Sequence, residues 1–475
     1  MNPTTAASRR RFLANAARAG LGASLPLGSL LGLAGCRAHR DNADPAKNAL
    51  PLLGYGTLAP ARDETTGKYL LKLPPGFRYR TLGWAGSKLA DGSRMPGAHD
   101  GMGIVAVNGS KLTLVRNHEV VAEDGALGAP LLHYDAPASG GCVAFEFDTN
   151  SGEAGGDRVV LGGTMQNCAG GTTPWGTWLS CEELVFDPAL GRDDTGTRRD
   201  KLNRAHGFVF EVHPSGSIAP RCLPGMGAFK HEAAAVHVAS GHVYLTEDLT
   251  QQAGFYRYVP NVPGNLAAGG RLQMLACKER SDFKRGLKLG RSFNTYWVDI
   301  SEPTRLTHSN GRVGGGVFEQ GEAAGGAVFT RLEGCFATTD AVFFTATDGG
   351  DFEHGQVFVF YPNEDRLALL YETASLLALD YPDNICVSPR GGLVICEDNN
   401  NDVAQRLIGM TSSGEVFPLA ENFVRWPDAA GTVQDLRNEE WCGACFSPDG
   451  KWLFANIYSP GFTVAITGPW GEGLV

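Results

Sequence analysis

The sequence lacks the short motifs that mark several large enzyme classes. It has no G-x-S-x-G elbow, so it offers no nucleophile for a serine hydrolase of the α/β type. His231-Glu232 is followed by Ala235 where a zinc-protease helix needs its second histidine, and no Walker loop follows a predicted strand. Asp449-Gly450 lacks the rest of a calcium-binding EF-hand loop. These absences leave four common kinds of catalytic or ion site without support.

Positive charge is also scarce. The chain has 41 Lys and Arg against 51 Asp and Glu, which gives a formal net charge of −10. An acidic protein repels the phosphate backbone, so we expect no nucleic acid partner. If the substrate is itself an anion, positive charge at the binding site must reverse the negative electrostatic potential there, and bound metal ions usually supply it.

No apolar run is long enough to span a bilayer comfortably. The longest one near the N-terminus, Ala19–Gly35, is short and contains Pro26. Ser8–Leu13 (S-R-R-R-F-L) precedes this run and Leu33–Cys36 (L-A-G-C) ends it. In this order they indicate a twin-arginine export signal and a lipobox.

We therefore expect residues 1–35 to be removed as a signal peptide and residues 36–50 to form a flexible tether. The twin-arginine export machinery would move the folded protein, and a lipid on Cys36 would anchor it to a membrane. Arg37 stands after the cysteine where a retention signal would have Asp, which favours the outer membrane. The predicted location is periplasmic or on the cell surface.

Cysteine is present but forms no metal-site pattern. Among 11 cysteines, Cys442 and Cys445 make the one C-x-x-C, with no second pair and no histidine nearby. In an oxidising compartment a local disulfide or a pair of buried thiols is the better interpretation.

A hairpin-like unit occurs six times along the chain. Each unit opens on a polar residue, continues through small residues to a turn, and ends in a β-prone run closed by an acid in most copies. Further strand pairs separate the units, so each repeat supplies a four-stranded blade. The sequence predicts an all-β, six-bladed β-propeller with long loop insertions, a single domain over residues 51–475, and a surface loop at Gly311–Gly326. The units are Asp100–Glu119, Asn167–Glu182, Glu232–Glu247, Glu333–Asp348, Asp383–Asp398 and Glu440–Ile457.

The acids at the ends of these units predict a metal centre. A hairpin returns its two ends to one place, and the inner strands of a propeller line its axis, so the carboxylates should meet at one mouth. They cannot all stay ionised there without cations, and Ca²⁺ prefers such oxygen ligands. The predicted metal carboxylates are Glu119, Glu182, Glu183, Glu232, Glu247, Glu333, Asp348, Asp383, Glu397, Asp398 and Glu440.

Several of these segments resemble the PhoX family of exported alkaline phosphatases. The similarity spans roughly residues 50–460, and the long segment around Trp175 and Cys181 is its most specific part. The segments are the twin-arginine signal, Arg116–Glu119, Asn167–Glu183, Lys230–Glu232, Arg331–Gly334 and Glu397–Asn399.

The resemblance implies calcium ions and a ferric pair bridged by an oxo group. On this analogy Cys181 is an iron ligand beside the carboxylates, and Arg331 binds phosphate; these two are the predicted catalytic residues. The implied activity is hydrolysis of phosphate monoesters, with a phosphorylated small molecule as substrate. The analogy also places Glu119, Glu182, Glu232, Glu333 and Glu397 among the metal ligands.

The chain departs from the family pattern in two ways. It is short beside typical members, and Leu332 stands where proline is expected between Arg331 and Glu333. Because loops shape the entrance to a substrate site, the resemblance supports the fold and the metal ions more strongly than it supports the activity. Two alternatives stay open: another calcium-propeller hydrolase, such as a lactonase or phosphodiesterase, and a non-catalytic surface binding module. A thiolate ligand at Cys181, and hence iron, would favour the phosphatase.

Overall fold

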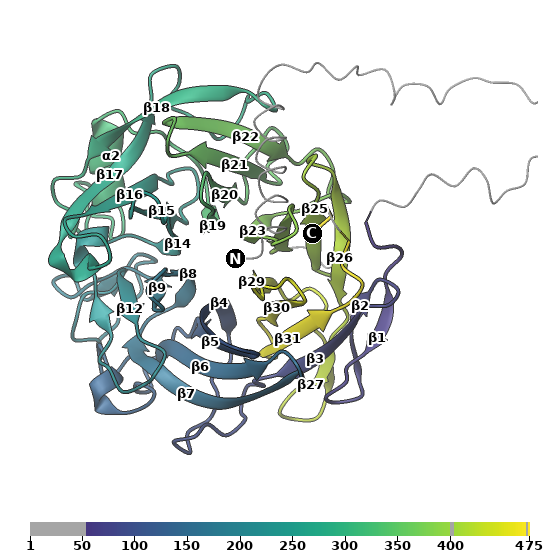
Figure 1. The fold of residues 1–475 in the computed structure, drawn as a ribbon. Helices are drawn as coiled ribbons and strands as arrows, with labels where there is room; N and C mark the ends of the chain where they lie inside the picture. Colours follow the sequence, from purple (N-terminus) through teal and green to yellow (C-terminus); the bar gives the residue numbers. More distant parts are fainter. Residues whose placement is uncertain (1–53, 400–402, 472–473) are drawn as a thin grey trace, which may run out of the picture.

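The computed structural model describes residues 54–399, 403–471 and 474–475. Signal peptide, Cys36 and tether lie outside the described residues. Antiparallel strands form six blades around a central axis (Figure 1), and the predicted all-β, six-bladed propeller is confirmed. The repeat made this prediction possible because each hairpin supplies the two innermost strands of one blade.

Each blade runs outward from the axis in chain order, apart from one strand. Blade 1 is β4 (His99–Asn108), β5 (Lys111–His118), β6 (Gly140–Asp148) and β7 (Glu153–Thr164). Blade 2 is β8 (Asn167–Thr172), β9 (Trp178–Glu182), β12 (Val209–Val212) and β13 (Arg221–Cys222). Blade 3 is β14 (His231–Val236), β15 (Val243–Glu247), β16 (Phe255–Pro260) and β17 (Gly270–Cys277).

The second half of the propeller repeats this arrangement. Blade 4 is β19 (Leu332–Ala337), β20 (Val342–Ala346), β21 (Gln356–Tyr361) and β22 (Arg366–Glu372). Blade 5 is β23 (Pro382–Val387), β24 (Leu393–Glu397), β25 (Arg406–Met410) and β26 (Val416–Asn422). Blade 6 is β29 (Trp441–Phe446), β30 (Trp452–Ile457), β31 (Phe462–Thr467) and β3 (Arg78–Leu82).

The two ends of the described chain close the propeller. β3 is the outermost strand of blade 6 and pairs antiparallel with β31, from Arg78 opposite Thr467 to Leu82 opposite Thr463. Figure 1 shows the purple β3 beside the yellow β31. β1 (Ala59–Arg62) and β2 (Tyr69–Leu73) extend blade 5 beyond β26. Because early and late segments share sheets, the blades cannot separate without breaking strand pairing.

One segment predicted as a surface loop is partly buried. Within Gly311–Gly326, helix α2 (Gly316–Ala323) places Val317 and Phe318 in the hydrophobic cluster of blades 2 and 3. That prediction was wrong because a glycine-rich composition hid the two apolar residues of a single helical turn. Strand β18 (Ser292–Asp299), just before it, pairs with both β17 and β22 and so joins blades 3 and 4.

No helix among the described residues is long and apolar enough to cross a membrane.

All six inner strands carry an irregularity near the same place. In β8, for instance, the register shifts between Asn167 and Gly170, and in β14 between His231 and Ala234. The same shift occurs in β4, β19 and β23, and in β29 it comes one residue later along the strand, between Cys442 and Cys445. A bulge leaves residues unpaired and re-aims their side chains. The second residue of five inner strands is therefore free to turn away from its own blade, and in β29 the corresponding residue is Gly443.

In five of the six inner strands a small residue follows at the next position and allows the blades to approach one another; β23 has Asn384 there. A Cβ on Gly101 would lie 2.5 Å from the Cα of Ala169, and one on Gly334 would lie 2.7 Å from the Cα of Asn384. These distances leave no room for a side chain. The glycines thus let neighbouring inner strands meet closely at the axis, which crowds the residues beside them.

Candidate metal centre

The second residues of the six inner strands form one ring around the axis, called here the axial ring. It consists of Asp100, Cys168, Glu232, Glu333, Asp383 and Cys442. Four carboxylates and the Cys168 thiol occupy equivalent unpaired positions in five blades, and Cys442 stands one residue before the equivalent position, Gly443, in blade 6. Ligand atoms of neighbouring members lie within 4.8 Å of one another from Cys442 through Asp100, Cys168, Glu232 and Glu333 to Asp383.

Three further carboxylates complete the groups that could hold an ion. Glu119 lies with Asp100 and Cys168, and Glu183 lies with Cys168 and Glu232. Glu440 lies with Asp100 and Cys442. Glu232, Glu333 and Asp383 form a fourth group from ring members alone. The structure therefore brings together Glu119, Glu183, Glu232, Glu333, Asp383 and Glu440 of the predicted metal residues.

Several ring oxygens are buried without a hydrogen-bond partner among the described residues. Neither carboxylate oxygen of Glu232 has one, although this side chain is fully buried. The same holds for Oδ1 of Asp100, which is 2% exposed. A buried polar atom without a partner is costly, and a cation would satisfy all three oxygens. The residues therefore fit bound metal ions.

The crowding also shifts the pKa values of these groups. Burial raises the pKa of Asp100 to about 7. Burial, together with the charges of Glu333 and Asp383, raises the pKa of Glu232 well above its usual range. The pKa values of Glu119 and Glu440 rise for the same two reasons, burial first and neighbouring carboxylates second. Without cations, burial and mutual repulsion thus favour the protonated form of these four carboxyls.

Two basic side chains border the ring. The Arg331 guanidinium donates to Glu333 Oε1 at 2.6 Å and to Asp248 Oδ1 at 3.1 Å. Lys230 Nζ lies 2.9 Å from Glu183 Oε1. Arg331 adopts a φ of +39°, an uncommon value for a residue with a Cβ, just before the inner strand β19 begins. Both cations are partly exposed, so both can meet a ligand that enters from this side.

Cys181 does not lie in the axial ring, contrary to the prediction. It is fully buried in the hydrophobic cluster between blades 2 and 3, with Leu179, Val209 and Leu245. The thiol at the axis of blade 2 is Cys168, whose Sγ is 3.4 Å from Asp100 Oδ2. The reason is strand order: Cys181 belongs to the second strand, where its side chain packs between blades, whereas Cys168 belongs to the innermost one.

Three predicted metal carboxylates turn instead to the third strand of their own blade. Glu182 accepts hydrogen bonds from the backbone N–H groups of Gly207 and Phe208. Glu247 accepts from the Gly254 N–H and the Tyr256 hydroxyl. Glu397 accepts two hydrogen bonds from the guanidinium of Arg406. Their shared position at the end of the second strand explains the acid found there in the repeat: it fixes the start of the third strand.

The last two predicted ligands lie near the ring but outside the four groups. Asp348 accepts a 2.6 Å hydrogen bond from the Thr330 hydroxyl. Asp398 is half-buried, and its pKa is raised mainly by burial, opposed by the charge of Arg331. Both border the side of the mouth on which Arg331 lies.

The neighbours Glu182 and Glu183 allow two roles of the acids to be tested separately: holding the start of the third strand and binding metal. Glu182→Gln would set an amide against backbone donors and weaken the bond to His206, so we expect a loss of about 3–5 kcal/mol and retained metal content in the folded fraction. Glu183→Gln should lower metal content while leaving the melting temperature of the metal-free protein unchanged or higher. Calorimetry and elemental analysis of both variants check this. The reverse pattern would contradict the assignment.

A cavity of about 460 Å³ continues along the axis behind the ring. Small and apolar residues line it, among them Gly101, Ala169, Ala233, Cys335 and Ala444, and no acid is among the described residues around it. The carboxylates are therefore confined to one mouth, as the hairpin argument predicted.

Asp100, Cys168 and Cys442 are site residues that the prediction omitted. Asp100 opened the first repeat unit and could have been found by treating opening residues as one set. The two cysteines stand one residue after Asn167 and two after Glu440. A repeat aligned on acids hides such positions, and only the strand register reveals them.

An acidic mouth on a six-bladed propeller, flanked by two cations, defines a candidate metal-dependent hydrolase for anionic substrates. The alkaline phosphatase PhoX family matches residues 53–153 and 147–461, nearly all of the described chain. The chain belongs to this family, which makes it a phosphatase-type hydrolase and confirms the resemblance found in the sequence.

One solved structure supports the fold. PhoX of Pseudomonas fluorescens in complex with vanadate, a transition state analogue, superposes with a TM-score of 0.62 at 18% identity, covering 86% of this chain and 97% of that one. A gluconolactonase of Xanthomonas campestris, XC5397, gives a TM-score of 0.41 at 13% identity, covering 88% of this chain and 99% of that one. No curated protein matches the sequence.

Proposed function

We propose that this chain is an exported phosphatase that hydrolyses phosphate monoesters of small molecules at metal ions in its acidic mouth. The observation that carries the proposal is the fully buried Glu232, both of whose oxygens lack a hydrogen-bond partner among the described residues while Glu333 and Asp383 lie beside it. Such an arrangement is costly unless cations are present. Family membership supplies the phosphate ester as substrate class.

The donor sets favour two kinds of ion. Glu232, Glu333 and Asp383 offer oxygen alone, which suits calcium. Cys168 adds a thiolate to Asp100 and Glu119, which suits iron in its ferric form better than calcium. When bound, these ions would neutralise the charge of the phosphate and act as Lewis acids.

Arg331 and Lys230 would orient the phosphate at the ring. Arg331 uses Nε and one amino group on Asp248 and Glu333, and its second amino group has no hydrogen-bond partner within the described part of the chain. That group can donate to a phosphate oxygen while the carboxylates hold the guanidinium in place. Lys230, held by Glu183, provides a second positive charge at the mouth.

The test combines an assay with metal analysis on the mature protein. We expect turnover of p-nitrophenyl phosphate, inhibition by phosphate and by vanadate, and calcium and iron in the purified protein. A metal-loaded protein that leaves p-nitrophenyl phosphate intact but cleaves bis-p-nitrophenyl phosphate or a lactone would contradict the phosphomonoesterase. A protein that turns over none of these substrates would instead support the binding module.

Export and lipid anchoring complete the proposal. The order of the Ser8–Leu13 motif, the apolar run and Cys36 supports a periplasmic or surface lipoprotein, with the outer membrane as the favoured anchor. We expect the double change Arg9→Lys, Arg10→Lys to leave unprocessed precursor in the cytoplasm, and Cys36→Ser to abolish lipid attachment. Cell fractionation with a radiolabelled fatty acid measures both. Unaltered export and labelling in these variants would refute this location.

A further inference from the structure

Cys442 of blade 6 is a second thiol at the mouth that Cys168 of blade 2 lines. Cys168 is the first residue of the register shift in β8, whereas Cys442 pairs with Asn456 and immediately precedes the shift in β29. The position equivalent to Cys168 is Gly443 in blade 6 and a carboxylate in the other four blades. The axial ring thus presents a second sulfur, one blade beyond Asp100.

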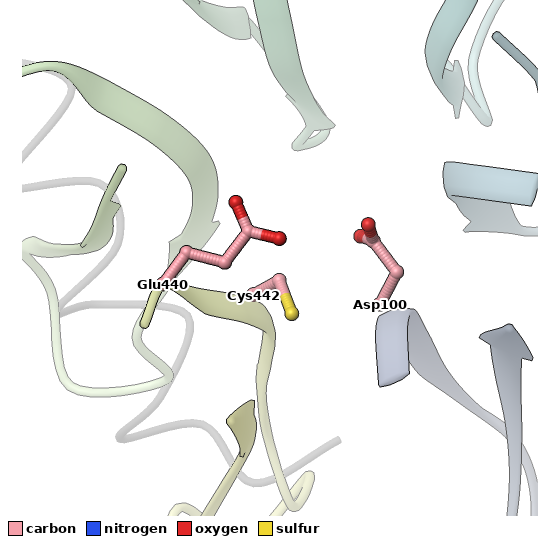
Figure 2. Close-up of side chains that lie close together, drawn as sticks. All are labelled: Asp100, Glu440 and Cys442. Atoms are coloured by element: carbon pink, nitrogen blue, oxygen red, sulfur yellow. The ribbon is translucent and has the colours of Figure 1, made fainter. Parts of the chain in front are cut away.

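The surroundings of Cys442 contain two further donors. Its Sγ, a carboxylate oxygen of Asp100 and one of Glu440 all lie within 4.8 Å of one another. Figure 2 shows Glu440 and Cys442 on one side and the carboxylate of Asp100 facing them from the other. Asp100 is 2% exposed, and its Oδ1 has no hydrogen-bond partner among the described residues. An oxygen that is buried, unpartnered and aimed at this group needs a cation or a proton.

We propose that Asp100, Glu440 and Cys442 form a second thiolate metal site, separate from the one that contains Cys168. Asp100 belongs to both groups, so its carboxylate would bridge two ions, one on each side. A set of one sulfur and two carboxylates favours a first-row transition metal such as iron, cobalt or zinc over calcium. Two adjacent mixed sulfur and oxygen sites would thus lie on one side of the ring and the oxygen-only group on the other.

Metal binding here requires the Cys442 sulfur to exchange its proton for the metal ion. In the metal-free protein the Cys442 thiol donates a 2.8 Å hydrogen bond to the His99 carbonyl. On binding, the S–H bond breaks, its proton leaves to solvent, and the sulfur electron pair forms the bond to the ion, with no change of oxidation state. The inference rests on metal binding at the ring as proposed above, but it does not require phosphatase activity.

The first experiment is a cobalt titration of the mature, metal-free protein, followed by the ultraviolet absorption of thiolate bound to Co²⁺. We expect Cys442→Ser and Cys168→Ser each to retain about half of the wild-type absorption, and the double variant to lose it. Cys445→Ser is the matched control, because Cys445 lies in the same strand but contacts the central cavity. It should match the wild type. Full wild-type absorption in Cys442→Ser, with all of it lost in Cys168→Ser, would overturn the proposal.

A second measurement uses the unaltered protein and so does not depend on how the variants fold. With two equivalents of zinc bound, X-ray absorption should show about one sulfur per zinc at about 2.3 Å. About one sulfur for every two zinc ions would mean that only Cys168 binds, which also overturns the proposal. Either result is independent of turnover, so a protein inactive on phosphate esters would refute the proposed function and leave this inference intact.

Discussion

Exhaustive chelation of the purified protein will lower its melting temperature by about 10 °C or more at pH 8 and abolish phosphatase activity. Structural metal ions contribute on the order of 10 kcal/mol to folding where ligands converge only in the native state. The axial ring meets this condition, because its members come from all six blades. Without ions, its carboxylates repel one another or must take up protons.

The same groups give the metal-free protein a distinctive pH dependence. Burial raises the pKa of Asp100 to about 7, and those of Glu119, Glu333 and Asp383 rise well above their usual range, burial again being the first cause. A carboxyl with a higher pKa in the folded state stabilises the fold fully below its unfolded pKa of about 4. This stabilisation is lost as the pH rises through the folded pKa. The metal-free protein should therefore melt at a higher temperature at pH 5 than at pH 8.

The metal-loaded protein should show the opposite trend, since protons compete with ions for the same oxygens. The gap in melting temperature between the two forms should widen from pH 5 to pH 8, as measured by scanning calorimetry with metal content verified at each pH. Coincident melting curves at pH 8, after proven loss of calcium and iron, would mean that the acids need no cations.

The propeller was predictable because its signal is local and repeated. In Val342–Ala346 and its counterparts, β-prone runs follow a turn at a fixed distance, and each hairpin folds from neighbouring residues. The closure by β3 was harder to predict from the sequence, because a single strand of five residues near the N-terminus completes a blade formed some 370 residues later. Nothing in its own composition specifies that partner.

The location of the site could be predicted from the sequence, but the particular residues that form it could not. The acids correctly indicated one mouth of the axis, yet Glu182 and Glu183 are neighbours with opposite roles. Alternation of side chains along a strand, combined with a bulge in the partner strand, decides which acid reaches the axis. Register is set by tertiary pairing, so a motif alone could not distinguish Cys181 from Cys168.

Replacing Arg331 by alanine is expected to reduce kcat/KM for p-nitrophenyl phosphate by a factor of about 10² to 10³. Its free amino group can donate to a phosphate oxygen whose charge changes in the transition state, while Asp248 and Glu333 hold the guanidinium in position. Arg331→Lys should lose nearly as much, because an ammonium cannot contact both carboxylates and the phosphate as a planar fork does. Phosphate inhibition should weaken in both variants.

Because Arg331 forms ion pairs, a loss of activity in its variants could also come from a structural role. Metal content and melting temperature distinguish that role from phosphate binding. If the residue only holds Glu333 in place, Arg331→Ala should release metal and lower the melting temperature, with activity per bound metal unchanged. Arg406→Lys is the matched control, since Arg406 pairs with Glu397 away from the ring. It should lower the melting temperature and leave kcat/KM within a few-fold of the wild type. If Arg331→Ala behaves like this control, the guanidinium does not bind phosphate, and Lys230 becomes the cation at the mouth to vary next.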